Sequence, residues 1–193
     1  YPIINLIFSL EASVHGLVTM PWGLFTSIFT HFDIYHILFN MIFLYFAGNM
    51  YERSFSANKL LLVYLFGGLF GGLFEVISGS FLFPENGAHH VIGASGSVMA
   101  IFTALAFYSP NTKVLLFGLL PVRLFVLALF FLASDLIGLG NQDDNVAHFA
   151  HIGGAFLGFL AVQNLISSKN ILIRIEKLVI AIQKRFKKKP KMY

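Results

Sequence analysis

Two polar residues stand at the start of two apolar stretches and carry the side chains needed for acyl transfer. Ser95 lies in Gly93-Ala94-Ser95-Gly96, directly before one apolar run, and His151 opens a second run. A hydroxyl or an imidazole without a hydrogen-bond partner costs several kcal/mol in apolar surroundings, so such residues are candidates for function. A serine hydroxyl attacks a carbonyl carbon when a histidine accepts its proton. We therefore consider Ser95 a candidate nucleophile and His151 a candidate general base and acid.

Two further residues offer hydrogen-bond donors near this pair. His36 and Asn40 are spaced i,i+4, which places them on one face of a helix. An oxyanion site requires donors aimed at the oxygen on which charge develops. The spacing therefore predicts an oxyanion site made of His36, Asn40 and the backbone N–H of Ser95. His31, just before this helix, is expected to support the loop rather than the chemistry.

These residues also have structural interpretations. Small residues such as those around Ser95 pack helices together in membranes. His148 and His151 are three apart, and with Asp143 or Asp144 they could bind a metal. Because no HExxH motif is present, we expect no zinc site of that kind. The chain has no cysteine, which excludes a thiol nucleophile and a thiolate metal site.

The elements that must position these residues are apolar helices. The chain is 57% hydrophobic and 11% charged, whereas soluble domains are about 25% charged, so an all-α polytopic membrane protein is predicted. Hydropathy predicts five spans within residues 35–166, preceded by an outer loop over residues 1–34. The five are Tyr35–Met50, Leu60–Phe81, Gly93–Tyr108, Leu124–Leu139 and Ala147–Ile166.

Charge predicts the orientation of these spans. The 13 Lys and Arg residues all fall on one side of the five-span arrangement. They lie in the first connection (Arg53, Lys59), in the third (Lys113, Arg123) and after the last span. Positive loops face the cytoplasm, so the C-terminus is predicted to be cytoplasmic and the candidate site to lie at the outer ends of the helices.

Glycine pairs predict how the helices pack. Gly67-Gly68 with Gly71-Gly72 form two overlapping GxxxG frames, and Gly154 with Gly158 form a third one directly after His151. Glycine lets two helix backbones approach closely. We expect the His151 helix to pack against the Ser95 helix. Glu75 and Asp135 are the remaining acids in the spans, and neither position indicates a third catalytic residue.

The last part of the chain has a different character. Residues 167–193 combine apolar residues at helical spacing with interspersed Lys and Arg. Such a pattern is typical of an interfacial helix on anionic lipid rather than of a nucleic-acid-binding segment. We therefore expect one membrane domain over residues 1–166 and a basic amphipathic cytoplasmic tail over residues 167–193.

Taken together, these residues resemble the rhomboid family of intramembrane serine proteases over about residues 21–166. The matching motifs are His31-Phe-Asp-Ile-Tyr-His36-Ile-Leu-Phe-Asn40, Gly93-Ala-Ser95-Gly96 and Ala150-His151-Ile-Gly-Gly154-Ala-Phe-Leu-Gly158. Glu52-Arg53 and Asp135 also fit. Three motifs in the same order and at the same depth make the resemblance specific.

The resemblance implies a six-helix bundle with the Ser95 helix at its centre. It implies a Ser95–His151 dyad without a carboxylate, and an oxyanion site from His36, Asn40 and the Ser95 amide. The expected activity is cleavage of transmembrane segments near their outer ends. No metal or cofactor is expected, and the partners are membrane-protein substrates within the bilayer. The expected location is a bacterial inner (plasma) membrane, with the active site facing outside.

The chain departs from the family pattern in two places. The family's first helix is missing, so we expect one helix to precede Tyr1. Met99 stands where an aromatic residue often stacks on the histidine, which predicts an altered position of His151.

Two other classes of function are alternatives to the protease. One is a catalytically silent rhomboid-like protein that binds membrane proteins, which would be expected to lack the serine or the histidine. The other is a small transporter lined by His148, His151 and Asp135. Transporters place charged residues deep in several broken helices, whereas the polar residues here gather at the outer ends. A different reactive serine, such as Ser97, is the remaining alternative for the nucleophile.

Overall fold

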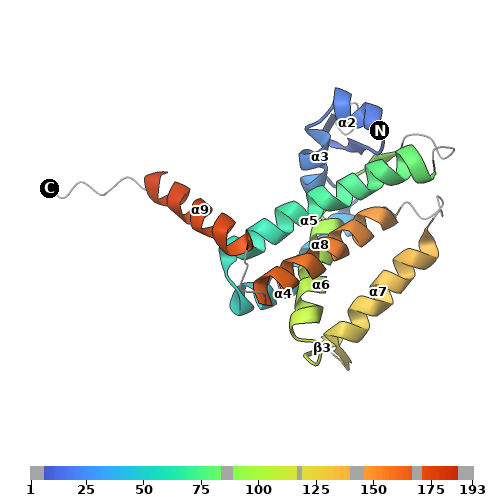
Figure 1. Ribbon diagram of the computed structural model, residues 1–193. Helices are drawn as coiled ribbons and strands as arrows, with labels where there is room; N and C mark the ends of the chain where they lie inside the picture. The colour runs from blue at the N-terminus through green and yellow to red at the C-terminus, as the bar shows by residue number, and fades with distance from the viewer. Residues whose placement is uncertain (1–6, 84–88, 117–118, 140–145, 167–170, 187–193) are drawn as a thin grey trace.

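The structure is a computed structural model that describes residues 7–83, 89–116, 119–139, 146–166 and 171–186. Within these residues, five helices form the body of the protein (Figure 1). They are α4 (Ile34–Ser54), α5 (Ala57–Ile77), α6 (Ser95–Tyr108), α7 (Leu124–Gly138) and α8 (His148–Ile166). Each coincides within a few residues with one of the five apolar segments predicted from the sequence. The prediction of a helical architecture is therefore confirmed for the described residues.

Length and hydropathy identify one of these helices as able to cross a membrane by itself. It is α5 together with its π-helical continuation η2 (Ser78–Leu82), which form a single apolar stretch over Ala57–Leu82. A second candidate is the pair made of Gly23–Phe29 and α4, which is bent by 86°. The apolar helices α6 and α7 have only 14 and 15 residues. Five crossings are therefore not established by length.

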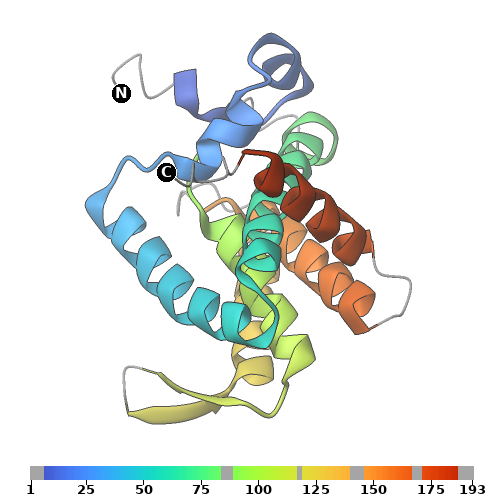
Figure 2. The same ribbon diagram turned by 90° about the vertical axis from the view of Figure 1, so that its left-hand side faces the viewer.

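Helix α6 lies at the centre of the bundle. Every residue from Gly96 to Ala106 is buried, and α6 contacts α4, α5, α7 and α8. A helix that is apolar on all sides is expected in the interior. Figure 2 shows α4 on one side of α6 and α8 on the other. The expectation that the Ser95 helix is short and central is confirmed.

Glycines set the closest helix contacts, as predicted. A Cβ added at Gly154 would overlap the carbonyl oxygen of Gly96, and one added at Gly158 would overlap the carbonyl of Ala100. Helix α5 also approaches α6 closely, since a Cβ at Gly67 would lie 2.5 Å from the Ala100 Cβ. Helices α5 and α8 thus both reach α6 at backbone distance, and they also contact each other.

Short elements before α4 cover one end of the bundle. They are β1 (Leu10–Glu11), α2 (Val14–Thr19), α3 (Gly23–Thr26) and η1 (Ser27–Phe29). Strand β1 pairs in antiparallel fashion with β2 (His90–Val91), and Leu10 faces Val91. The segment that leads to Ser95 is therefore joined to the N-terminal part of the described chain.

The all-α prediction misses two short ladders, β1–β2 and a hairpin. Strands β3 (Lys113–Leu116) and β4 (Leu120–Arg123) pair from Lys113↔Arg123 to Leu116↔Leu120. From the sequence, this stretch is expected only to be a basic connection between two spans. Its backbone groups lie outside any helix, and pairing two adjacent strands satisfies them. The hairpin lies at the same end of the bundle as the α4–α5 junction (Figure 1).

Helix α9 (Ile171–Phe186) projects from the bundle beside the start of α5 (Figure 1). Glu176 holds it there, since its carboxylate lies 3.3 Å from the Lys59 ammonium and accepts a 2.7 Å hydrogen bond from Ser56 Oγ. Leu178 and Ile182 are exposed on α9. Asp143, Asp144 and the Lys187–Lys191 run lie outside the described residues.

Candidate active site

Ser95 occupies the first position of α6 and is half-buried. The residue before it, Ala94, provides no side-chain cap. The first N–H groups of an α-helix have no acceptor within the helix, and this end of the helix carries a partial positive charge. The Ser95 hydroxyl and backbone N–H therefore stand where a developing negative charge is stabilised.

Gly93 allows the His36 side chain to lie against the backbone just before Ser95. Its φ of +111° lies in the region that favours glycine. A Cβ at Gly93 would also lie 2.6 Å from both Cε1 and Nε2 of the His36 imidazole. The His36 ring edge is thus packed against the backbone two residues before Ser95, as an oxyanion donor requires.

Helix α4 presents His36 through its N-terminal cap. The Asp33 carboxylate accepts hydrogen bonds from the backbone N–H groups of Tyr35 (2.8 Å) and His36 (3.0 Å). An aspartate at this position satisfies donors that the helix leaves open. The cap therefore fixes the first turn of α4, which contains His36.

His31 supports the loop, as expected from the sequence. Its Nε2 accepts a 3.3 Å hydrogen bond from the backbone N–H of Ala94. Its ring stands edge-on to the His36 ring, with the centroids 4.9 Å apart. The Gly93 N–H is held by the Ser27 carbonyl at 2.9 Å. Two anchored N–H groups thus fix the backbone just before Ser95.

Asn40 is buried one turn after His36 and is not placed against Ser95 by any hydrogen bond among the described residues. Its side-chain amide donates a 2.9 Å bond to the His36 carbonyl of the same helix. The second amide hydrogen is the donor left for a substrate. The predicted role of Asn40 remains a prediction.

A carboxylate lies behind His151, a contact that the sequence did not predict. Asp135 on α7 is buried, and its Oδ1 lies 2.7 Å from His151 Nδ1. Its position in the sequence did not reveal this contact, because the contact depends on how α7 is turned toward α8. An ionised carboxylate only accepts hydrogen bonds, so a contact with an ionised Asp135 requires the proton on Nδ1 of His151 and leaves Nε2 unprotonated.

The same oxygen of Asp135 also holds His148. His148 Nδ1 lies 2.9 Å from Asp135 Oδ1. The two histidines named above as possible metal ligands therefore contact the same carboxylate oxygen from positions three residues apart on α8. The aspartates considered with them, Asp143 and Asp144, lie outside the described residues.

Close packing of α6 and α8 places Ser95 and His151 on adjoining turns. Gly96 faces Ala150, with an added Cβ 3.0 Å from its carbonyl oxygen, and Gly154 faces Gly96. His36 and His151 are also close enough to interact electrostatically. No hydrogen bond joins the Ser95 hydroxyl to His151 in the described part of the chain. Catalytic hydrogen bonds are often loose before substrate binds.

The alternative nucleophile Ser97 is poorly placed for chemistry. It is fully buried, and a Cβ added at Gly68 would lie 2.6 Å from its Oγ. A hydroxyl packed between α5 and α6 cannot reach a substrate carbonyl. The geometry therefore favours Ser95.

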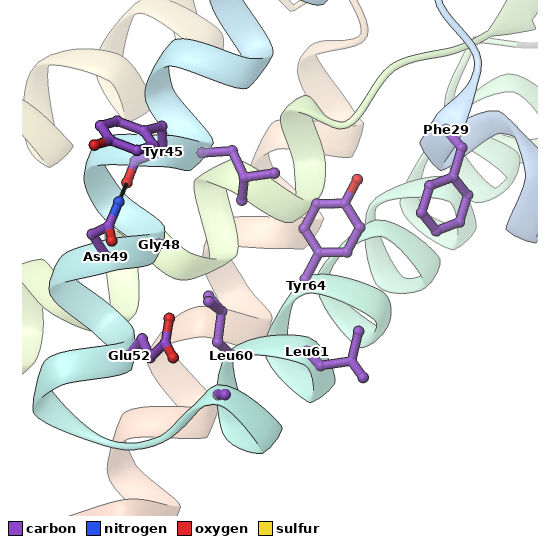
Figure 3. A pocket seen from close by; sticks show the side chains of 10 residues that line it. Phe29, Tyr45, Gly48, Asn49, Glu52, Leu60, Leu61 and Tyr64 are labelled. Atoms are coloured by element: carbon purple, nitrogen blue, oxygen red, sulfur yellow. Dashed lines mark hydrogen bonds between the residues drawn. The ribbon is translucent and has the colours of Figure 1, made fainter.

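A groove between α4 and α5 lies away from these residues. It is lined by ten residues, among them Tyr45, Asn49 and Tyr64 (Figure 3). The Asn49 amide donates to the Tyr45 carbonyl at 2.6 Å, so this polar group is satisfied within α4. None of the candidate catalytic residues lines the groove.

Several known proteins have sequences similar to this chain. Residues 18–168 match the Rhomboid domain family. The chain is 34% identical over 149 residues to RHOMBOID-like protein 12, mitochondrial, of Arabidopsis thaliana, covering 72% of this chain and 44% of that protein. It is 28% identical over 144 residues to Rhomboid protease GluP of Bacillus subtilis (75% and 26% covered). It is 30% identical over 154 residues to Rhomboid protease AarA of Providencia stuartii (72% and 54%). The match spans 26% to 54% of the length of these relatives.

Proposed function

This chain belongs to the rhomboid family, and we propose that it is an intramembrane serine endopeptidase. Rhomboids are integral membrane proteins, and the family contains serine proteases, two of which are among the relatives above. The observation that carries the proposal is the contact of Gly154 with Gly96. It sets the turn of α8 that bears His151 against the turn of α6 that bears Ser95.

The first step is attack by Ser95 on a peptide carbonyl. The Ser95 Oγ forms a bond to the carbonyl carbon while His151 Nε2 takes the hydroxyl proton. Asp135 supports this role because its contact with Nδ1 fixes the tautomer that leaves Nε2 unprotonated. The carboxylate also stabilises the imidazolium that forms.

The oxyanion that results lies near the N-terminus of α6. The Ser95 N–H, the His36 ring edge and the second Asn40 amide hydrogen are the proposed donors. One such donor contributes about 3–4 kcal/mol to the transition state. Only donors that bind the oxygen more strongly once the carbonyl carbon has become tetrahedral raise the rate of the chemical step.

Collapse of the tetrahedral intermediate completes the reaction. The C–N bond breaks, and His151 gives its proton to the leaving amine, so the new N-terminus departs neutral. Water then gives a proton to His151 as its oxygen attacks the acyl carbon. The ester bond to Ser95 breaks, the hydroxyl regains its proton and a carboxylic acid is released.

The proposed substrates are transmembrane segments of other proteins, cleaved near their outer ends. This part of the proposal rests on the predicted five spans within residues 35–166, with Ser95 and His151 at the ends opposite the basic connections. The relatives include a mitochondrial and two bacterial proteins. Location in a bacterial inner membrane, with the site facing outside, therefore stays a prediction.

The division into a membrane domain (residues 1–166) and a basic cytoplasmic tail (residues 167–193) is part of the proposal. Exposed Leu178 and Ile182, together with exposed Arg174, Lys177 and Lys184, support a helix α9 lying on anionic lipid. A silent membrane-protein-binding rhomboid is the alternative function. It is not favoured, because the serine and the histidine are both in place.

Reaction with a fluorophosphonate tests the nucleophile without knowledge of the substrate. This reagent bonds covalently to an activated serine hydroxyl. We expect the native chain to be labelled and Ser95→Ala to be unlabelled, with Ser97→Ala as the matched control that keeps its labelling. Labelling that persists in Ser95→Ala, or is lost only in Ser97→Ala, contradicts the assignment.

A further inference from the structure

Glu75 is a buried carboxylate that the proposed chemistry does not use. It lies near the end of α5 and is 2% exposed. A buried ionisable side chain is retained only when its polar atoms have partners. The two carboxylate oxygens of Glu75 contact two different segments of the protein, and each segment leads to a candidate catalytic residue.

The first oxygen holds the start of α8. Glu75 Oε1 accepts a 3.0 Å hydrogen bond from the backbone N–H of Ala150. Ala150 is the third residue of α8, so its N–H belongs to the group that has no acceptor within the helix. The residue that follows it is His151. A carboxylate at this end of a helix is also electrostatically favourable.

One turn before Glu75, a glycine allows this approach. A Cβ at Gly71 would lie 2.6 Å from the Ala150 carbonyl oxygen. Gly71 and Glu75 are spaced i,i+4 and share a face of α5. The helix therefore contacts both the N–H and the C=O of Ala150, which fixes the peptide units on either side of that residue.

The second oxygen holds the segment that leads to Ser95. Glu75 Oε2 lies 3.3 Å from His89 Nε2. His89 directly precedes β2, and its carbonyl accepts a 2.8 Å bond from the Ala12 N–H. The chain then runs through β2 to Gly93 and Ser95. The Glu75 side chain thus contacts both the start of α8, which carries His151, and the residue before β2, which leads to Ser95.

From this geometry we propose that Glu75 is a positioning residue for the Ser95–His151 pair. It acts as a hydrogen-bond acceptor that fixes the first turn of α8, and through His89 it ties that turn to the strand before Ser95. The inference rests on the proposed function. It assigns to Glu75 no contact with substrate. Loss of the acceptor should misplace His151, and misplacement by about 1 Å can cost on the order of a hundredfold in rate.

The test compares four variants of the full chain in lipid nanodiscs. Glu75→Leu removes the acceptor and keeps the approximate volume, while Glu75→Gln keeps an acceptor oxygen of the same reach. Val63→Ala is the matched control, because Val63 is a buried residue of the same helix in the main core. Ser95→Ala reports on the proposed function itself. Each chain is assayed for cleavage of a fluorogenic transmembrane reporter, for fluorophosphonate labelling rate and for Tm.

We expect Glu75→Leu to lower kcat by about tenfold to a hundredfold with KM nearly unchanged, and to slow fluorophosphonate labelling by a similar factor. Glu75→Gln should stay within about threefold of the native kcat. Val63→Ala should lower Tm without a comparable loss of kcat. A role in stability alone predicts instead that activity follows Tm across all these variants, and that result overturns the inference.

Two further outcomes are decisive. If Glu75→Gln loses as much kcat as Glu75→Leu, hydrogen-bond acceptance is not the role of Glu75. If Glu75→Leu does not fold, Glu75→Asp replaces it, because a carboxylate one methylene shorter loses contact with Ala150. A reduced kcat in Glu75→Asp supports the inference, and a native kcat overturns it. Full cleavage by Ser95→Ala would refute the proposed function, whereas Ser95-dependent cleavage that ignores Glu75 refutes only this inference.

Discussion

At the scale of single residues, the chemistry depends on which nitrogen of His151 is free. Asp135 contacts Nδ1 at 2.7 Å and contacts His148 as well. This leaves Nε2 as the atom that can accept the serine proton. A neutral side chain of the same shape at position 135 would not fix the same tautomer, because an amide can donate as well as accept.

Asp135→Asn should therefore lower kcat by about tenfold to a hundredfold and leave KM nearly unchanged, since the loss falls on orientation of the base. Steady-state cleavage of a transmembrane reporter measures both constants. Ser134→Ala is the control, because the Ser134 hydroxyl donates to the Phe130 carbonyl of its own helix. Native kcat in Asp135→Asn would show that the carboxylate does not orient His151.

A second residue-scale property is the charge state of His31. Burial lowers the pKa of its imidazole below the ordinary value of 6.5; the nearby His36 lowers it further, while the Phe29 backbone carbonyl acts in the opposite direction. The neutral ring can accept the Ala94 N–H, whereas the protonated ring cannot. His31 therefore contributes fully to stability above pH 6.5, and this contribution is lost as the pH falls through its lower folded-state pKa.

We expect Tm to fall between about pH 7.5 and about pH 5.5, and the fall to be smaller in His31→Gln, whose amide oxygen accepts without titrating in this range. Thermal unfolding at the two pH values provides the measurement. His15→Gln, at an exposed position of α2, is the control and should retain the native pH dependence. An unchanged pH dependence in His31→Gln would remove His31 as the cause.

Some of these residues can be predicted from the sequence, and others cannot. Ser95 and His151 are apparent because a polar residue that opens an apolar run is costly. The contact of Asp135 with His151 joins two helices whose relative rotation no local pattern encodes. One partner of Glu75 is the backbone N–H of Ala150, and a backbone group has no signal in the sequence. Residues that act through main-chain contacts are therefore found only in the structure.

At the scale of elements, the contact between α6 and α8 brings together the turns that carry the proposed nucleophile and base. Gly154 and Gly158 on α8 face the carbonyls of Gly96 and Ala100 on α6. The GxxxG spacing predicted this packing, because glycine at that interval leaves a flat strip along a helix. The two β ladders were not predicted, since strands of two to four residues carry too little periodicity.

Gly154→Ala tests this element. The new Cβ would overlap the Gly96 carbonyl, a backbone atom that cannot rotate away, so α6 and α8 must separate. We expect a loss of about 1–3 kcal/mol in stability and a reduced rate of fluorophosphonate labelling. Gly48→Ala on α4 is the matched control, because its Cβ would lie 3.7 Å from the Leu60 side chain. Equal effects of the two substitutions would contradict the role of Gly154.

At the scale of the whole molecule, charge and helix order predict an orientation in the membrane. The α4–α5 junction and the β3–β4 hairpin carry basic residues, and the described residues before α4 lie at the opposite end (Figure 1). Composition and charge distribution predicted the membrane class and the five helices. They do not establish the number of membrane crossings, because α6 and α7 are shorter than an average span of about 20 residues.

Cysteine labelling tests this orientation, and the absence of native cysteine leaves the background clean. His15→Cys and Ser54→Cys place one thiol at each end, both at exposed positions. We expect a membrane-impermeant maleimide to label His15→Cys on intact cells, and to label Ser54→Cys only after the membrane is opened. Labelling of both from the same side, or the reverse pattern, would contradict the proposed orientation.

The most direct test of the central claim is cleavage of a transmembrane reporter by the native chain, Ser95→Ala and His151→Ala in the same membrane preparation. If Ser95 and His151 act together as nucleophile and base, either substitution alone lowers kcat by at least about a thousandfold, and both together lower it little further. Native cleavage by either variant, at equal folded amounts of protein, would contradict the claim.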